Sequence, residues 1–133
     1  MTMSASTPQA RAHVREAFEK LRAAMDVAAA TFTHGAGVAT AMLDAIDNEP
    51  SLTNLVASFP VAEQRKSLTV SLENYETCLR DVRIALWRVM RSEGCTIGEI
   101  SQIFGLSRQR VSRQLRDANV ATASSRDRSP KRR

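Results

Sequence analysis

The sequence has few of the residues and patterns on which catalysis or metal binding depends. Its two cysteines, Cys78 and Cys95, have no histidine or second cysteine at metal-ligand spacing, so we expect free thiols and no metal. His13 and His34 are too far apart in sequence to indicate a metal site. There is no strand-like alternation, no phosphate-binding loop, and no nucleophile with a histidine and a carboxylate at a recognisable spacing. These absences predict a protein that is not an enzyme and uses no cofactor.

Long uncharged apolar runs are also missing. Residues 1–12 have no apolar core of signal-peptide length, and no later segment has the length and apolarity of a membrane span. We therefore expect a cytoplasmic, nucleoid-associated protein that makes no contact with a membrane.

Basic charge is present in excess but unevenly distributed. The 133 residues have a net charge of +5, yet residues 1–60 hold four basic and six acidic side chains, whereas residues 61–133 hold fifteen and eight. Residues 100–133 alone hold nine basic and two acidic side chains. This concentration of positive charge at one end favours a polyanionic partner.

Apolar residues recur at helical spacing through the first half of the chain. In the first helix they are Val14, Phe18, Leu21, Met25, Ala28 and Phe32. We expect this helix to end at residues 33–37, where Gly35 and Gly37 lie, and a second helix to run from near Val38 to residues 48–50. Ser51 is expected to cap a short helix that reaches Phe59.

A long helix is predicted from Pro60 to Glu93, where glycine is absent and no further proline occurs. A four-three repeat runs along it through Leu68, Leu72, Tyr75, Leu79, Val82, Leu86 and Val89. The β-branched and hydroxyl residues of 67–71 leave open whether the helix is continuous. The repeat has two interpretations, which can coexist: the core of an intrachain bundle with the first helix, or the coiled-coil interface of a homodimer.

Residues 94–116 carry the most informative pattern. Gly94 is expected to end the long helix, and Thr96 with Glu99 has the spacing of a capping box at the start of a new helix. That helix should end at Gly105, after which Ser107 can cap a second helix with Val111 and Leu115 on its inner face.

The outer face of this second helix is basic and polar, and residues 108–116 include no acidic residue. Such side chains hydrogen-bond to base edges and phosphates. We expect Gln109, Arg110 and Arg113 to contact bases, and Ser107, Arg108, Ser112 and Arg116 to contact phosphates. The full set of expected DNA-binding residues is Ser107, Arg108, Gln109, Arg110, Ser112, Arg113, Gln114 and Arg116.

The run Gly105-Leu106-Ser107-Arg108-Gln109-Arg110-Val111-Ser112 resembles the helix-turn-helix of bacterial transcription regulators, sigma factors and resolvases. The resemblance covers residues 94–116, with Ile84, Trp87 and Met90 expected to pack the preceding helix onto them. It implies major-groove binding by the second helix. One departure is that Leu115 follows Val111 by four residues, where many members of the family place an apolar residue three later; Gln114 occupies that position here.

Together these patterns predict an all-α protein. We expect a flexible lead over residues 1–9, a helical bundle or dimerisation region over 10–93, a helix-turn-helix module over 80–120 that shares the long helix, and a disordered basic tail over 121–133. The expected function is sequence-specific binding of double-stranded DNA as a homodimer, in transcriptional regulation. The alternatives are an architectural, nucleoid-associated protein with little sequence preference and an interaction module that contacts RNA polymerase or another regulator.

Overall fold

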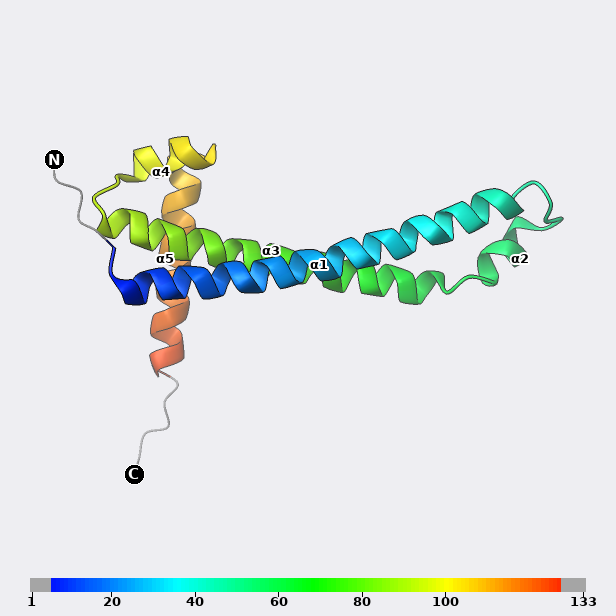
Figure 1. Cartoon of the computed structure of the whole chain (residues 1–133), viewed down its shortest axis with the longest axis horizontal. Coiled ribbons are helices and arrows are strands. Elements are labelled where there is room, and N and C mark those ends of the chain that lie inside the picture. The colour runs from blue at the N-terminus through cyan, green and yellow to red at the C-terminus, as the bar shows by residue number, and fades with distance from the viewer. Residues whose placement is uncertain (1–5, 128–133) are drawn as a thin grey trace, which may run out of the picture. The chain divides into compact units, whose positions relative to one another are not determined.

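The computed structural model describes residues 6–127, with the backbone alone described for 122–127. These residues form α-helices and contain no strand, which confirms the all-α prediction (Figure 1). The helices are α1 (Pro8–Ala45), α2 (Leu52–Ala57), α3 (Val61–Ser92), α4 (Ile97–Phe104) and α5 (Arg108–Asp127). No helix within this part of the chain is long and apolar enough to cross a membrane.

The chain divides into two compact units. The first comprises Met1–Ala17 and Arg80–Arg133, and the second comprises Phe18–Leu79. The second unit therefore contains most of α1, all of α2 and the first part of α3, whereas α4 and α5 belong to the first.

The expected break in the first helix does not occur, because α1 continues without interruption from Pro8 to Ala45. Neither Gly35 nor Gly37 has a positive φ. A glycine within a helix costs about 1 kcal/mol relative to alanine, a penalty that tertiary packing offsets. Gly35 has a packing role: a Cβ built on it would lie 3.2 Å from Nε2 of Gln64 on α3.

Within the second unit, α1 and α3 run antiparallel (Figure 1). The seam, by which we mean the line of contact between the two helices, has mainly small side chains. Oγ1 of Thr31 and Oγ of Ser71 are 3.1 Å apart and share a hydrogen bond across this seam. The least exposed residues of α1 in the unit are Leu21, Ala24, Ala28, Thr31, Gly35, Val38, Met42 and Ala45. Their spacing alternates between three and four residues, and small residues at these positions allow close helix approach.

The predicted seam is confirmed at Leu21 and Ala28, which are buried, and is displaced by one position at other residues. The structure buries Ala24 and leaves Met25 exposed, and it buries Ser71 and leaves Leu72 exposed. The sequence repeat follows the largest apolar side chains, whereas the intrachain contact uses the smaller residues beside them.

The other predicted elements of this unit are present. Ser51 caps α2, its Oγ accepting a hydrogen bond from the backbone N–H of Asn54 at 3.2 Å. The helix α3 is continuous through residues 67–71. Oγ1 of Thr69 donates to the carbonyl of Arg65 along the helix at 2.9 Å, and the Ser71 hydroxyl pairs with Thr31 across the seam.

Helical structure extends into both segments that we expected to be flexible. The helix α1 begins at Pro8, and Oγ1 of Thr7 accepts a hydrogen bond from the N–H of Ala10 at 3.1 Å. At the other end α5 continues to Asp127, through the first residues of the expected tail. Residues 1–5 of the lead and 128–133 of the tail lie outside the described residues.

Candidate nucleic-acid interface

A capping box starts α4, as the sequence predicts. The N–H of Glu99 donates to Oγ1 of Thr96 at 3.1 Å, and the N–H of Thr96 donates to Oε1 of Glu99 at 3.2 Å. Before it, Gly94 ends α3 with a φ of 101°. These reciprocal bonds satisfy amides that have no partner within the helix, so the first turn of α4 is held in place.

A tight turn joins α4 to α5. Gly105 adopts the left-handed conformation, with φ 65° and ψ 31°, and the N–H of Leu106 donates to the carbonyl of Ser101 at 3.0 Å. Ser107 then caps α5, because its Oγ accepts from the N–H of Arg110 at 3.1 Å. The chain thus reverses from one helix into the next within three residues.

Three fully buried side chains hold this corner on the end of α3. Trp87 of α3, Ile100 of α4 and Val111 of α5 each have 0% exposure and form one apolar cluster. The rings of Trp87 and Phe104 meet edge to face at 5.6 Å. Farther along α5, Nη2 of Arg88 donates to Oδ1 of Asn119 at 3.2 Å. The inner face of α5 is therefore fixed, and its opposite face is left to solvent.

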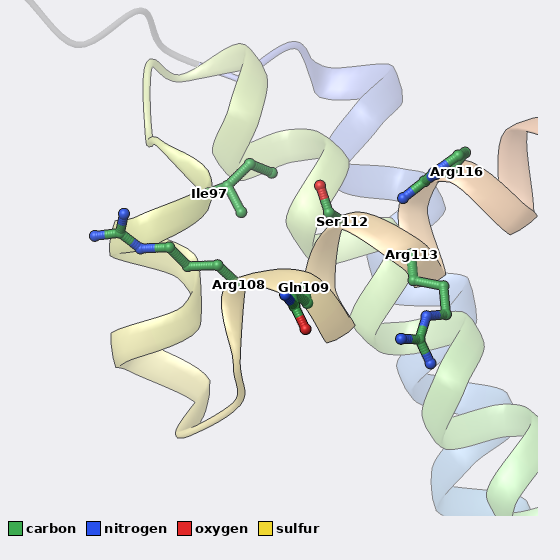
Figure 2. A pocket seen from close by; sticks show the side chains of 6 residues that line it. All are labelled: Ile97, Arg108, Gln109, Ser112, Arg113 and Arg116. Atoms are coloured by element: carbon green, nitrogen blue, oxygen red, sulfur yellow. The ribbon is translucent and has the colours of Figure 1, made fainter.

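An open hollow of about 580 Å³ lies on that exposed face, which we call the α5 hollow (Figure 2). Its lining includes three arginines and no acidic residue. In Figure 2, Arg108 extends along α4, whereas Arg113 and Arg116 extend on the other side of Gln109 and Ser112. The complete lining is Ile97, Arg108, Gln109, Ser112, Arg113 and Arg116.

Gly98 determines where Arg108 can lie. A Cβ built on Gly98 would lie 2.9 Å from Nη2 and 3.1 Å from Cζ of Arg108, so the guanidinium rests against the glycine backbone. Gly98 is in the first turn of α4, where backbone amides and the helix dipole favour anions. The Glu99 carboxylate and the Thr96 hydroxyl already cap the start of α4, so the positive charge on this side of the hollow comes from the Arg108 guanidinium.

Five of the eight predicted contact residues line the hollow together: Arg108, Gln109, Ser112, Arg113 and Arg116. Ser107 is exposed but serves as the cap of α5. Arg110 is exposed and is not among the lining residues. Gln114 is half-buried, and its Oε1 is buried without a hydrogen-bond partner among the described residues. Sequence reasoning did not single out Ile97, which lines the hollow from α4, or Gly98, which lies against the Arg108 side chain. The turn at Gly105 brings both residues near α5.

The chemistry available at this surface is recognition of anions and hydrogen-bonding edges. Guanidinium groups bind phosphate and guanine in a bidentate manner, and a glutamine amide can pair with adenine. No protein-family model, curated protein or solved structure matches the chain. Its function must therefore be inferred from the surface itself. Among the described residues, no group of three His, Cys, Asp or Glu is placed to hold a metal ion.

Proposed function

We propose that α4 and α5 form a helix-turn-helix that binds double-stranded DNA, with α5 in the major groove. The observation that carries the proposal is the α5 hollow, where Arg108, Arg113 and Arg116 surround Gln109 and Ser112 without an acidic neighbour in the lining. A solvated helix face that had no polyanionic partner would ordinarily carry both signs of charge.

The rigid attachment of α5 supports a role in reading sequence. Val111 is buried against Trp87 and Ile100, so side chains that project from the opposite face have a defined direction. Base recognition needs such positioning, because the donors and acceptors of base edges must be matched in register. We assign Gln109 and Arg113 to base edges and Arg108 and Arg116 to phosphates, and we expect Arg110 to contribute from the margin of the surface.

The biological role proposed for this activity is transcriptional regulation by a homodimer. One helix-turn-helix makes few base contacts, and two copies that bind half-sites one DNA turn apart supply the affinity that one copy lacks. The resemblance of residues 105–112 to bacterial regulators is in keeping with this role.

The test is fluorescence anisotropy with a pool of fragmented genomic duplexes at two salt concentrations, followed by sequencing of the bound fraction. We expect the protein to enrich a small set of sites. Arg113→Ala should lower affinity for those sites by about 1–3 kcal/mol and relax the preference, whereas Arg108→Ala should weaken all duplexes alike and reduce the salt slope by about one.

Arg80→Ala is the matched control, because it removes the same charge from an exposed position on α3. It should bind as the parent protein does. The parent, Arg113→Ala and Arg80→Ala could instead bind equally, enrich no site and lose DNA binding at moderate salt. That result would replace this proposal with an architectural role. Absence of binding would refute DNA recognition altogether.

A further inference from the structure

The second unit leaves a row of large apolar side chains exposed along α1. Phe18, Met25 and Phe32 recur every seven residues, and their exposed fractions are 44%, 49% and 52%. Residues seven apart are separated by nearly two full helical turns, so the three side chains lie along one line of the helix.

The helix α3 adds to the same flank. Phe32 and Leu72 directly follow Thr31 and Ser71, whose side chains are hydrogen-bonded to each other. In an antiparallel pair, the positions that follow two facing residues lie on one flank, because one helix turns clockwise and the other anticlockwise from a common viewpoint. Leu72 is 38% exposed, and Leu79, seven residues later, is half-buried. We call Phe18, Met25, Phe32, Leu72 and Leu79 the apolar flank.

The opposite flank differs in character. The positions that precede the seam residues there are small or polar except for Val27 and Val70, which are 55% and 57% exposed. They are Lys20, Ala23, Val27, Ala30 and His34 on α1 and Ser67, Val70 and Asn74 on α3. The exposed large apolar side chains of the pair are thus concentrated on one flank, as expected of a surface that is covered by another protein layer.

The unit buries little of its own apolar surface. Among its described residues, the buried apolar side chains are Leu21, Ala24, Ala28 and Leu55, of which two are alanines. Domains are ordinarily built from two packed layers around a core, and one pair of helices with an alanine seam is a single layer. A second layer over the apolar flank would supply the missing core.

We propose that the apolar flank is the homodimer interface, on which the same flank of a second copy packs to form a four-helix arrangement. The exposed parts of Phe18, Met25, Phe32 and Leu72 amount to roughly 350 Å² for side chains of this size. That is close to half of the about 800 Å² that each partner contributes to a stable interface, and the small residues between them supply further area.

The borders of the flank favour a second copy over an unrelated partner. Arg22 lies between Phe18 and Met25 on the outer edge of α1, and Glu76 lies between Leu72 and Leu79 on the outer edge of α3. Asp26 lies one turn after Arg22 on the same edge of α1, so this edge has both signs of charge. A two-fold copy in which each α1 covers the partner's α3 brings Arg22 of one protomer toward Glu76 of the other. This interface uses none of the DNA-contact residues, so it stands without the proposed function.

Sedimentation equilibrium of the full chain without DNA tests the proposal. The parent protein should be dimeric at micromolar concentration, and Met25→Glu with Phe32→Glu should be monomeric. The matched control is Val27→Glu with Val70→Glu, which adds the same two charges at residues that are 55% and 57% exposed on the opposite flank and should remain dimeric. A monomeric parent, or dimers that persist in the double variant, would overturn the proposal.

A milder substitution covers the case in which the double glutamate variant fails to fold. In Met25→Cys, alkylation of the new thiol should slow as protein concentration rises, whereas in Val27→Cys the rate should stay constant; peptide mapping separates both from Cys78 and Cys95. Equal concentration dependence at the two positions would contradict the assignment of this flank. A dimer that binds no DNA would refute DNA recognition and leave this interface standing. A monomer that binds a specific site would refute this interface and the proposed homodimer and leave DNA recognition by α5 standing.

Discussion

Val111 connects the interior of the molecule to its proposed binding surface. It is fully buried with Trp87 and Ile100, although Arg110 and Ser112 on either side of it are exposed. Truncating it therefore removes core packing beneath the proposed contact surface, and none of the groups that would touch DNA.

For Val111→Ala we expect the free energy of unfolding to fall by about 2 kcal/mol, from lost burial and the cavity left behind. Thermal or urea unfolding followed by circular dichroism measures the change. Ser112→Ala, one residue later and exposed, should stay within about 0.5 kcal/mol of the parent. Similar losses from the two substitutions would contradict the packing described for α5.

Gly98 allows a separate test of the position of Arg108. In Gly98→Ala the added methyl group would lie against the guanidinium, which must move because its atoms are within 2.9–3.1 Å of the new carbon. The expected result is weaker DNA binding, measured by anisotropy, without loss of stability, since alanine favours the helix by up to about 1 kcal/mol. Unchanged affinity would mean that the observed placement of Arg108 does not matter for binding.

At the scale of the elements, a glycine inside a helix and a glycine at a helix end have opposite effects on stability. Gly37 lies inside α1 without a positive φ, and a Cβ added to it would meet no atom within 4 Å, whereas Gly105 closes α4 at a φ of 65°. Gly37→Ala should raise the free energy of unfolding by about 0.5–1 kcal/mol, and Gly105→Ala should lower it by about 1–2 kcal/mol. Chemical denaturation of both variants measures the pair, and effects of the same sign would contradict these conformations.

The helical segments were predictable wherever a local signal decided them. Ser51, the Thr96–Glu99 capping box and Gly105 each act through hydrogen bonds or backbone angles within a few residues, so their spacing sufficed. The continuity of α1 past Gly35 was not predictable, because a glycine lowers helix propensity by only about 1 kcal/mol and does not by itself decide whether a helix ends. The displaced positions of the seam were not predictable either. Periodicity locates the apolar stripe of a helix, but it does not tell which neighbouring helix packs against that stripe.

The candidate site divides in the same way. Gln109 and Arg113 follow from the period of α5 once Val111 is taken as buried, and they line the hollow. Arg110 and Gln114 lie on α5 between its buried face and its exposed face, where the position of the neighbouring helices decides how exposed a side chain is. Ile97 and Gly98 precede the turn, and only the folded corner brings Ile97 to the hollow and Gly98 against Arg108.

At the scale of the whole molecule, the two proposals predict linked behaviour. A homodimer should bind a duplex with two half-sites about 34 Å apart more tightly than a duplex with one. Met25→Glu with Phe32→Glu should abolish that advantage while keeping binding to the single half-site, because its α5 residues are unchanged. Anisotropy titrations on both duplexes measure the effect, and an undiminished preference for the double site in a monomeric variant would contradict the link.

The hydrogen bond between Thr31 and Ser71 has a consequence for folding fidelity. Alanines look alike after a slip of one helical turn, so a seam built from Ala24 and Ala28 alone would discriminate poorly between alternative alignments of α1 and α3. Oγ1 of Thr31 donates to the carbonyl of Val27 at 3.0 Å in its own helix, so the buried Ser71 hydroxyl is the one that loses its partner across the seam in a shifted alignment. The hydrogen bond between the two hydroxyls thereby favours one register of α1 against α3, the register in which Phe32 and Leu72 lie at the same level on one flank.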